Sequence, residues 1–311
     1  MENARILIYG VGTVGIHFGG KLAKAGFEVT FVDKPERAEG LNQSGLLVQA
    51  LSGSFELNPV VRSDLEGIGP QDFILICVKA IHTYEIALNL LPVIKPSTAL
   101  LSFQNGLENE NILAELLGPN LVLGTVLHFH GRLEEGYRSV QDSPAHVVFG
   151  ERDHQPSGRE EWLSEIFSKA DIDHVISHNI NQKIWEHFLW NSAFSSIGAL
   201  TGSTVQQILE HQPMLPTLEL MMHEAMQVAN AEGVEVSQAA IEEMNKTQVK
   251  YSHIKSPMLQ DMEAGRQPEL EPMLGVLLKK AQRKGIFLPV NTAVYNLLSL
   301  TCTHFGGEEE E

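Results

Sequence analysis

The chain has 311 residues and a formal net charge of −17, and 43% of its residues are hydrophobic and 20% charged. This length allows two domains with sizeable cores, and the composition is ordinary for a globular protein. The acidic balance argues against nucleic-acid binding, which requires a basic face. Its apolar runs are shorter than the about 18 residues that a membrane-spanning helix needs, so the sequence predicts no membrane span.

The two cysteines, Cys77 and Cys302, stand far apart in the sequence. Isolated cysteines fit a reducing cytoplasm and a core role rather than a disulfide framework, so we expect a cytoplasmic protein. The first expected strand begins at residue 5, and no signal peptide is predicted. His128 and His130 are spaced as on one face of a strand. Because they lack acidic or cysteine neighbours at ligand spacing, we predict no metal site.

A glycine-rich turn stands between the first expected strand, residues 5–9, and the first expected helix, which runs to Ala25. The turn consists of Gly10, Val11, Gly12, Thr13, Val14 and Gly15, a G-x-G-x-x-G pattern. In a dinucleotide-binding turn, Gly10 permits the tight turn, Gly12 lets the backbone approach a pyrophosphate, and Gly15 lets the helix pack on the strand. The flanking strand and helix favour dinucleotide binding over a turn that serves packing alone.

The second expected strand, residues 28–33, ends at Asp33. Dinucleotide-binding folds place an acid for the ribose hydroxyls at about this distance from the glycines. We therefore predict that the adenine ribose of the cofactor lies near Asp33 and its neighbour Lys34.

Strand and helix patterns alternate through the first half of the chain. Further strands are expected at residues 73–79, 99–104, 121–126, 146–150 and 174–177, with helices at 84–91, 109–117 and 159–170. Short apolar strands that alternate with helices are typical of a parallel sheet covered on both faces.

Helical patterns replace the strand signals after about residue 178. They cover residues 181–199, 216–232, 237–251, 269–284 and 291–302. The sequence therefore predicts an α/β fold in which a Rossmann-type doubly wound sheet domain is followed by an all-helical domain. The expected bounds are 1–178 for the dinucleotide-binding domain, 179–306 for a helical substrate and dimerisation domain, and 307–311 for an acidic tail.

Two loops follow expected strands at the edge where open α/β sheets bind their ligands. Lys79 follows the strand that starts at residue 73, and its ammonium group can reach a cofactor phosphate or ribose. The alternative for Lys79 is a solvated lysine at a strand end. Asn105 lies in Gln104-Asn105-Gly106 after the strand that starts at residue 99. Asn-Gly is also ordinary turn chemistry, but an amide there can bond a carbonyl group and the nicotinamide ribose.

Several short motifs follow one another along almost the whole chain. They are Gly10-x-Gly12-x-x-Gly15, Asp72 leading into Val78-Lys79, Gln104-Asn105-Gly106, Val148-Phe149-Gly150-Glu151, Trp185 followed by Asn191, Glu224-Ala225 running to Gly233, Met258-Leu259-Gln260-Asp261, Ala264-Gly265-Arg266, Glu269, Gly285 and Pro289-Val290-Asn291. In this order and spacing the chain resembles the ketopantoate reductase (2-dehydropantoate 2-reductase) family. The resemblance implies a Rossmann domain, a helical domain and an active site in the cleft between them. It also implies hydride transfer from NADPH to the 2-oxo group of a small branched acid.

The proton donor that the resemblance implies is changed in this chain. The family has a lysine two residues after the tryptophan, and here His187 follows Trp185 at that distance. Lys183, His187, Asn191 and Ser195 are spaced by four residues and so share one helix face. His187 can act as the acid itself, because imidazolium titrates near neutral pH. Alternatively Lys183 donates the proton from one turn earlier, or His187 only packs and neither residue is the donor. In that last case a bound water or Glu269 is the next catalytic candidate.

The substrate contacts that the resemblance implies are conserved in part. Asn191 matches the first of two substrate-binding asparagines, and Ser195 replaces the second. The family's substrate-binding serine is replaced by Pro257, with Ser256 one residue earlier. Glu269 matches a substrate-contacting glutamate, the alternative being an ordinary exposed helical glutamate.

The residues near the expected adenine ribose give two signals about the cofactor. Asp33 favours NAD, because a carboxylate accepts hydrogen bonds from the ribose 2′-OH and repels a 2′-phosphate. Lys34 stands where the family has a phosphate-binding arginine, and Arg37 is nearby. We predict NADP from the resemblance and the two cations, while Asp33 leaves NAD open.

Three hypotheses about function follow. The leading one is a cytoplasmic NADPH-dependent reductase of a small 2-oxo acid, with 2-dehydropantoate in pantothenate biosynthesis as the first substrate. The second is a paralogous enzyme for another 2-oxo or hydroxy acid, which the changes at residues 187, 195 and 257 favour. The third is an NAD(P)-binding sensor without catalysis. We expect a monomer or homodimer whose partner is a small molecule, and neither nucleic acid nor a membrane.

Overall fold

The computed structural model describes residues 4–242 and 253–303. The chain forms two compact units, which are described separately below. The first unit comprises Met1–Gln104 and Asn109–Ile180, and the second comprises Asn105–Glu108 and Asn181–Glu311. The division drawn from the sequence assigns residues 105–108 to the sheet domain, whereas their contacts group them with the helical unit.

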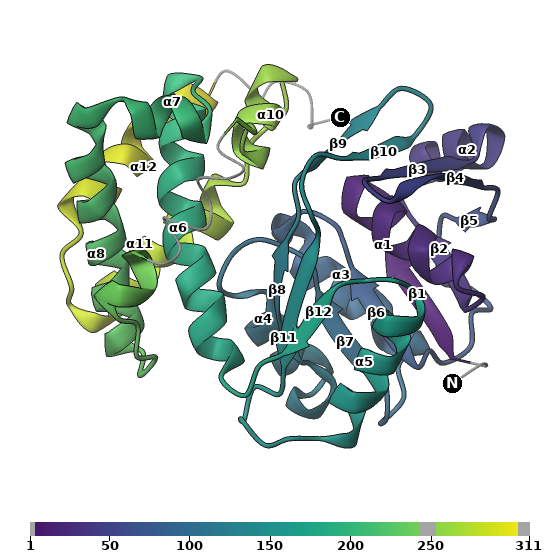
Figure 1. The fold of residues 1–311 in the computed structure, drawn as a ribbon. Coiled ribbons are helices and arrows are strands. Elements are labelled where there is room, and N and C mark those ends of the chain that lie inside the picture. The colour runs from purple at the N-terminus through teal and green to yellow at the C-terminus, as the bar shows by residue number, and fades with distance from the viewer. Residues whose placement is uncertain (1–3, 243–252, 304–311) are drawn as a thin grey trace. The chain divides into compact units, whose positions relative to one another are not determined.

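A five-stranded parallel sheet is the centre of the first unit (Figure 1). Its strands are β1 (Arg5–Tyr9), β2 (Glu28–Val32), β5 (Val61–Arg62), β6 (Phe73–Ile76) and β7 (Ala99–Ser102). They lie in the order β5-β2-β1-β6-β7, and every neighbouring pair is parallel, with Ile8 between Phe31 and Leu75. The chain therefore winds outward from β1 in both directions, which confirms the predicted doubly wound sheet.

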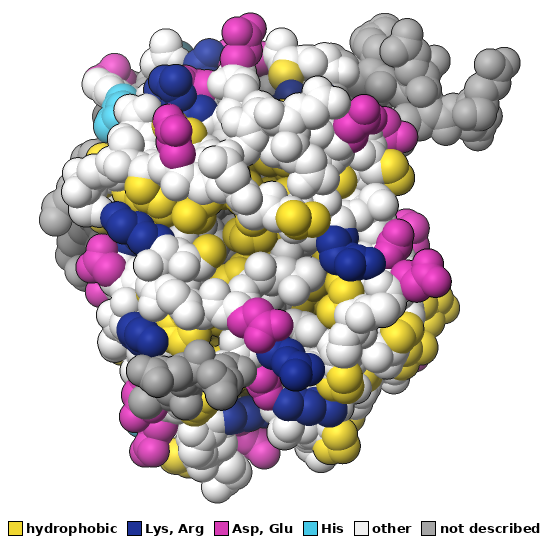
Figure 2. Space-filling model, turned by 90° about the vertical axis from the view of Figure 1, so that its right-hand side faces the viewer, with side chains coloured by type: hydrophobic (Ala, Val, Ile, Leu, Met, Phe, Trp, Pro, Cys, Tyr) yellow, Lys and Arg dark blue, Asp and Glu magenta, His cyan; other side chains and the backbone are white. Residues whose placement is uncertain are grey.

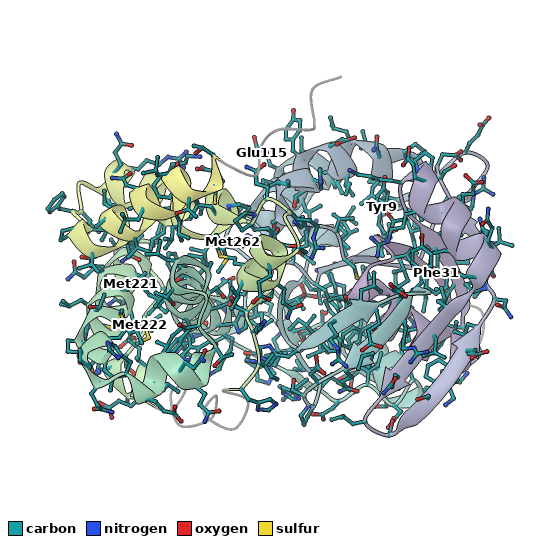
Figure 3. All side chains as sticks on the ribbon, turned by 90° about the horizontal axis from the view of Figure 1, so that it is seen from above. Tyr9, Phe31, Glu115, Met221, Met222 and Met262 are labelled. Atoms are coloured by element: carbon teal, nitrogen blue, oxygen red, sulfur yellow. The ribbon has the colours of Figure 1, made fainter. Side chains whose placement is uncertain are left out.

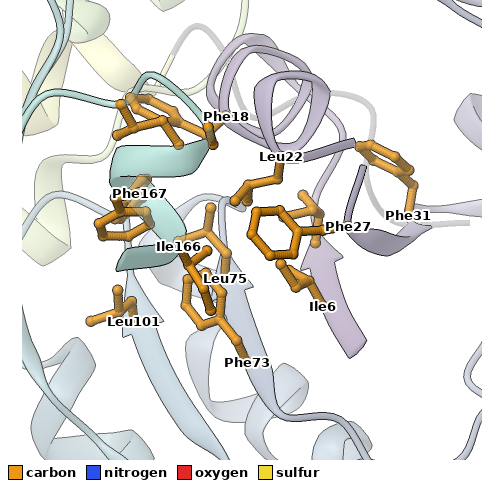
Figure 4. Close-up of a cluster of buried hydrophobic side chains, with 14 of the residues drawn as sticks. Ile6, Phe18, Leu22, Phe27, Phe31, Phe73, Leu75, Leu101, Ile166 and Phe167 are labelled. Carbon is orange, nitrogen blue, oxygen red and sulfur yellow. The ribbon is translucent and has the colours of Figure 1, made fainter. Parts of the chain in front are cut away.

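Side chains of the central strands alternate between two apolar cores. Ile6, Phe73, Leu75 and Leu101 point into the core that Figure 4 shows, where they meet Phe18, Leu22 and Phe167. Leu7, Ile74 and Leu100 belong to a separate core on the other face. The helices that supply these cores are α1 (Thr13–Lys24) and α5 (Gly158–Lys169) for the first, and α3 (Thr83–Leu90) and α4 (Asn109–Leu117) for the second. Burial on both faces explains why these strands are apolar without alternation.

Two smaller sheets complete the first unit. One has the order β4-β3-β10-β9 and the other β12-β11-β8. Their strands are β3 (Leu46–Ala50), β4 (Gly53–Leu57), β8 (Gly124–His128), β9 (Gly131–Glu134), β10 (Arg138–Gln141), β11 (His146–Gly150) and β12 (His174–Ile176), and the remaining helices are α2 (Pro35–Ser44), η1 (Ala80–His82), η2 (Leu91–Val93) and η3 (Pro119–Leu121).

The later strands join a different sheet from the one that their pattern predicts. The prediction that residues 121–126, 146–150 and 174–177 are strands of the one parallel sheet is wrong. In the structure these segments form the sheet β12-β11-β8, in which β8 runs antiparallel to β11. The apolar pattern of a strand records its burial and not its partner, so the pattern alone could not show this reversal.

The second unit consists of helices joined by loops, with no strand among its described residues. Its helices are α6 (Ile180–Thr201), α7 (Val205–Glu210), η4 (Gln212–Met214), α8 (Leu215–Ala231), α10 (Pro257–Glu263), the π-helix η6 (Glu271–Gly275), α11 (Val276–Lys284) and α12 (Pro289–Cys302). Helix α6 has buried apolar side chains around most of its circumference, among them Trp185 and Phe194, as expected for a helix inside a bundle. They share one core with Met221 and Met222 of α8, which Figure 3 labels.

Glycine and proline mark the helix ends in this unit, at Gly285 and Pro289. Gly285 has a left-handed backbone with φ of +67° and ends α11, and Pro289 occupies the first turn of α12. The helix expected at 269–284 begins one residue later than predicted, at Leu270, and its first part is the π-helix η6. Part of the helix expected at 237–251, and the tail at 307–311, lie outside the described residues.

Two of the motif segments meet inside the helical unit. The buried carboxylate of Glu224 on α8 accepts hydrogen bonds from the backbone N–H groups of Val290 and Asn291, each over 2.9 Å. It also accepts one from the side-chain amide of Asn291 over 2.7 Å. Glu224 thus satisfies N–H groups in the first turn of α12, which no residue within that helix can do. These motifs serve the packing of α8 against α12.

None of the helices in the described ranges is long and apolar enough to cross a membrane. Basic and acidic side chains are interspersed on the face that Figure 2 shows, with apolar side chains between them.

Candidate active site

The glycine-rich turn joins β1 to α1 and is fixed by close backbone packing. Gly10 has a φ of +97°, and a Cβ atom there would lie 2.6 Å from Cγ1 of Val78 and 2.9 Å from the carbonyl carbon of Cys77. A Cβ atom at Gly15 would overlap the carbonyl oxygen of Gly10. Only glycine therefore fits at either position, because the end of β6 and the start of α1 both press on the turn.

Gly12 differs from the other two glycines of the turn. It is the N-cap residue of α1, and a Cβ atom added to it meets no atom of the described protein within 4 Å. Gly12 is half-buried, with open space beside it at the N-terminus of a helix, where N–H groups point outward and favour an anion. This geometry fits the pyrophosphate of a dinucleotide.

The carboxylate of Asp33 is bound to the same turn. Its Oδ2 accepts a hydrogen bond from the backbone N–H of Val11 over 2.6 Å, and its Oδ1 accepts one from the N–H of Lys34 over 2.8 Å. Nε of Arg37 lies 3.5 Å from Oδ2 of Asp33 and donates a hydrogen bond to the carbonyl oxygen of Val11 over 3.2 Å. Asp33, just after β2, and Arg37, on α2, therefore hold the turn, while Lys34 is exposed.

Two further predicted residues follow strands of the same sheet. Lys79 comes directly before η1, after β6, and is half-buried. Gln104 follows β7, and its side-chain amide donates hydrogen bonds to the carbonyl oxygen of Val78 and to Oγ1 of Thr83, each over 3.0 Å. Because β1, β6 and β7 are parallel, Lys79 and Gln104 lie at the same carboxyl edge as the glycine-rich turn.

Three of the predicted substrate-binding residues form one chain of hydrogen bonds within the helical unit. Oγ of Ser195 donates to Oδ1 of Asn191 over 2.7 Å, and Nδ2 of Asn191 donates to Oδ1 of Asn105 over 3.0 Å. Asn191 and Ser195 are one turn apart on α6, which agrees with the shared face expected from their spacing. The network orients both amides, since each oxygen is committed to a donor.

The two candidate proton donors occupy different environments on α6. Nζ of Lys183 lies 2.7 Å from Oε2 of Glu186, and half of the Lys183 side chain is exposed to solvent. Gln182 donates to the other oxygen of Glu186 over 2.8 Å. His187, one turn before Asn191, is half-buried. Lys183 is therefore committed to a carboxylate, while His187 shares its part of the helix with the amide network.

The last two predicted residues lie at helix N-termini of the same unit. Ser256 is the N-cap of α10, and its Oγ accepts a hydrogen bond from the N–H of Leu259 over 3.2 Å. It is 9% exposed, so helix capping accounts for the residue structurally. Glu269 is half-buried and precedes the helical residues, so it is not an ordinary exposed glutamate on a helix surface.

Sequence reasoning missed two residues with clear roles. Gln104 was part of a motif, but its bridge from β7 to the end of β6 has no sequence signal, because it joins residues 26 positions apart. Glu186 could have been found from its spacing to Gln182 and Lys183, which is typical of side-chain pairs on a helix. Within the described part of the chain, no group of three or more His, Cys, Asp or Glu side chains is placed to hold a metal ion.

Comparison with known proteins identifies the family. Residues 6–154 match the family described as "Ketopantoate reductase PanE/ApbA", and residues 179–301 match "Ketopantoate reductase PanE/ApbA C terminal". The chain belongs to the ketopantoate reductase family. By that membership it is an oxidoreductase, and the family implies a nicotinamide dinucleotide as the cofactor.

Individual relatives cover nearly the whole chain at modest identity. The "Uncharacterized oxidoreductase YkpB" of Bacillus subtilis is 30% identical over 298 residues, which are 95% of this chain and 98% of the relative. A "2-dehydropantoate 2-reductase" of Archaeoglobus fulgidus is 29% identical over 298 residues, covering 96% and 98% of the two chains. The crystal structure of 2-dehydropantoate 2-reductase from Geobacter metallireducens has a TM-score of 0.89 at 27% identity and covers 96% of this chain and 99% of its own.

Proposed function

We propose that this chain reduces the 2-oxo group of a small acid with NADPH, and that 2-dehydropantoate, which gives pantoate in pantothenate biosynthesis, is its substrate. The observation that carries the proposal is the hydrogen-bond chain from Ser195 through Asn191 to Asn105. It presents oriented amides at the loop that follows β7, and loops after the strands of open α/β sheets are where ligands bind. Several relatives in this family are named 2-dehydropantoate 2-reductase.

The cofactor supplies the hydride when it is bound, and the residues of the chain orient the cofactor and compensate the charge of its phosphates. In the proposal, Gly10–Gly15 and the N-terminus of α1 hold the pyrophosphate, and Lys79 contacts a phosphate or ribose. Lys34 and Arg37 favour the 2′-phosphate of NADPH. Asp33 already accepts two backbone N–H groups and lies beside Arg37, so its charge is partly compensated where the ribose would lie.

The reaction places negative charge on the carbonyl oxygen, so a proton donor must lie within hydrogen-bond reach. In the proposal, the amides of Asn105 and Asn191 hold the substrate oxygens and His187 donates the proton. Glu269 and Ser256 contact the remainder of the acid. The ion pair with Glu186 makes Lys183 the weaker candidate, because proton loss from Lys183 would leave that carboxylate without its counter-charge.

A different 2-oxo acid is the second candidate substrate. Two specific observations favour it, namely His187 at the family's lysine position and Ser195 at the position of the second asparagine. In the structure Ser195 is turned toward Asn191 and bonded to it, so it supports an amide and does not replace one. The two enzyme hypotheses share the cofactor and differ only in the acid.

A steady-state screen tests the proposal. Oxidation of NADPH and of NADH is measured at 340 nm with 2-dehydropantoate and with a panel of linear, branched and aromatic 2-oxo acids. The proposal predicts the highest kcat/KM for 2-dehydropantoate with NADPH. A higher kcat/KM for another acid would move the chain to the second candidate. Tight NADPH binding without turnover of any acid would exclude both enzyme hypotheses and favour the NAD(P)-binding sensor.

A further inference from the structure

A buried lysine on α11 joins three segments of the helical unit. Nζ of Lys280 lies 2.5 Å from Oε1 of Glu108 and 3.1 Å from Oε2 of Glu232, and the Lys280 side chain is 11% exposed. Glu232 is the C-cap residue of α8, and Glu108 lies in the loop 105–108. Lys280 thus ties α11 to the end of α8 and to the loop that carries Asn105.

The charge of Lys280 is maintained by its two partners. Burial opposes the charged form of the ammonium group, but the hydrogen bonds and charges of Glu108 and Glu232 outweigh burial and hold its pKa above the ordinary value. A buried charge with its counter-charges in place is tolerated, whereas removing one partner leaves an uncompensated charge. Each charge of the cluster is therefore compensated by the others.

Lys284, one turn further along α11, pairs with Glu232, which is one of the two partners of Lys280. Its Nζ lies 3.0 Å from Oε1 of Glu232. Two lysines of α11 therefore pair with Glu232 at the end of α8. If Lys280 is replaced, the ion pair between Lys284 and Glu232 still joins the two helices. The contact with Glu108, in contrast, comes from Lys280. Lys284 is accordingly a matched control for the loop contact.

The loop 105–108 is held at three points within four residues. Asn105 accepts the amide of Asn191 over 3.0 Å, Leu107 is buried in the core of the helical unit, and Glu108 pairs with Lys280. Gly106 supplies the bend between them with a φ of +113°. Three residues of chain span about 10 Å at most, so displacement of Glu108 is transmitted directly to Asn105.

We propose that Lys280, acting through Glu108, is a positioning residue that sets the orientation of the Asn105 amide for the 2-oxo acid. This inference rests on the proposed function, in which Asn105 contacts the substrate. Reactions of this kind depend on donors held in place before the transition state forms, and a shift of about 1 Å can cost about 100-fold in rate. The need to hold the Asn105 amide in place explains why the loop 105–108 is fixed by a buried ion pair between Glu108 and Lys280.

The test compares Lys280→Met with Lys284→Met. Both variants lose an ammonium group from the same helix, but only the first removes the ion pair with Glu108. For Lys280→Met we expect kcat/KM for the 2-oxo acid to fall about 10- to 100-fold with NADPH affinity unchanged, and for Lys284→Met we expect less than about a twofold change. Lys280→Arg keeps the charge and should restore most of the activity. Glu108→Gln should match Lys280→Met, and the double variant should be no worse than either, because both remove one interaction.

Hydrogen exchange of the amides of residues 105–108 gives a readout that does not need turnover. Exchange should accelerate in Lys280→Met and Glu108→Gln and remain at the wild-type rate in Lys284→Met. Equal exchange and equal kcat/KM in the two methionine variants would overturn the positioning role. If wild-type protein turns over no 2-oxo acid, the proposed function fails, and the exchange rates decide by themselves whether Lys280 positions the loop. Faster exchange with unchanged kcat/KM would show that the loop is held but that its position does not matter to the reaction, which also overturns the inference.

Discussion

The side-chain amide of Asn191 donates a hydrogen bond to the side-chain oxygen of Asn105 over 3.0 Å, although the residues are 86 positions apart. This bond decides how the Asn105 amide is turned, because its oxygen faces Asn191 and its NH₂ group faces the other way. The Ser195 hydroxyl orients the Asn191 amide in the same way, by donating a hydrogen bond to the side-chain oxygen of Asn191. The result is a chain of hydrogen bonds that runs from the Ser195 hydroxyl through the Asn191 amide to the side-chain oxygen of Asn105.

Replacement of Asn191 by alanine should therefore lower kcat/KM for the 2-oxo acid by about 100-fold. Loss of one donor to a developing oxyanion typically costs about 10²–10³-fold, and Asn191→Ala also releases Asn105. Ser192→Ala is the matched control, because the Ser192 hydroxyl is buried on the same helix and donates a hydrogen bond within it, to the carbonyl oxygen of Leu189. An Asn191→Ala enzyme as active as the Ser192→Ala enzyme would remove the network from the site.

Gly12→Val should abolish dinucleotide binding and leave the protein folded. The structure shows open space where a side chain at Gly12 would extend, so the added atoms would meet the pyrophosphate and not the protein. NADPH affinity, measured by fluorescence titration, should fall at least about 100-fold while the unfolding temperature stays at the wild-type value. Gly158→Val is the control, since Gly158 also has open space around it but lies at the start of α5. Unchanged NADPH affinity in folded Gly12→Val protein would exclude the glycine-rich turn as the binding site.

Lys34→Ala should weaken NADPH binding by about 10- to 100-fold and leave NADH binding nearly unchanged. A hydrogen bond between charged groups contributes about 1.5–3 kcal/mol, and about 1.4 kcal/mol corresponds to a tenfold change in affinity. Arg37→Met is the informative contrast, because Arg37 supports the turn through the carbonyl oxygen of Val11. Arg37→Met should therefore weaken the binding of both nucleotides, and of NADPH more than NADH, because Arg37 also favours the 2′-phosphate in the proposal. Equal losses of NADPH and NADH in Lys34→Ala would show that Lys34 does not contact the 2′-phosphate, and a preference for NADH in the wild type would assign specificity to Asp33.

Local sequence signals were sufficient for the parts of the protein that depend on local structure. The turn at Gly10–Gly15 was predictable because strand, glycines and helix are contiguous, and the face shared by Asn191 and Ser195 follows from helix geometry alone. The hydrogen bond between Asn105 and Asn191 and the ion pair between Glu108 and Lys280 were not predictable in this way. They join distant segments, and a single sequence contains no period that connects them.

The same reasoning explains the missed strands. Residues 46–50 and 138–141 pair as β3 and β10 across about ninety positions, and both are short and partly polar. Their stability comes in part from packing against α1, where Val48 lies beside Gly20 and is fully buried, and where Oγ of Ser139 donates a hydrogen bond to the carbonyl oxygen of Thr13 over 2.8 Å. Strand propensity depends on such packing more than on the backbone, so it cannot be recognised before the fold is known.

His17 should make the first unit sensitive to acid. The ring lies in α1 with no solvent exposure, it packs against Phe18 and Phe129, and neither ring nitrogen has a hydrogen-bond partner among the described residues. Burial, with a smaller effect from the charge of Lys21, lowers the pKa of His17 from 6.5 to about 4. Protonation therefore favours the unfolded state, and stability present above pH 6.5 is lost as the pH falls toward 4. The loss should reach roughly 2.5 kcal/mol by pH 4.5.

Urea unfolding of wild type and His17→Leu at pH 7.5 and 4.5 measures this loss. Trp162 belongs to the first unit, so a background with Trp185→Phe and Trp190→Phe leaves it as the single fluorescent reporter. The free energy of unfolding should fall between the two pH values by roughly 2.5 kcal/mol more in protein with His17 than in His17→Leu. An identical fall in both would show that carboxylates alone govern the acid sensitivity.

His187→Ala should lower kcat about 10²–10⁴-fold, the range for a positioned general acid, and leave NADPH binding intact. His187 lies one turn before Asn191 on α6, so its ring belongs to the same part of the helix as the amide that would hold the substrate. His187→Gln should be as slow as His187→Ala, since glutamine can form hydrogen bonds but cannot transfer a proton. The wild-type rate should fall as the pH rises and the imidazolium loses its proton, and this limb of the pH profile should be absent from both variants.

Lys183→Ala is the contrast that decides between the two donors. Lys183 is half-exposed and paired with Glu186 over 2.7 Å, so its loss should change kcat less than about threefold if His187 is the acid. The opposite pattern, with a crippled Lys183→Ala enzyme and a nearly silent His187→Ala enzyme, would move the donor one turn toward the start of α6. If both variants keep full activity, neither residue is the acid. Glu269, half-buried in the segment just before η6, then becomes the group to replace, and Glu269→Gln should abolish the pH dependence of the rate.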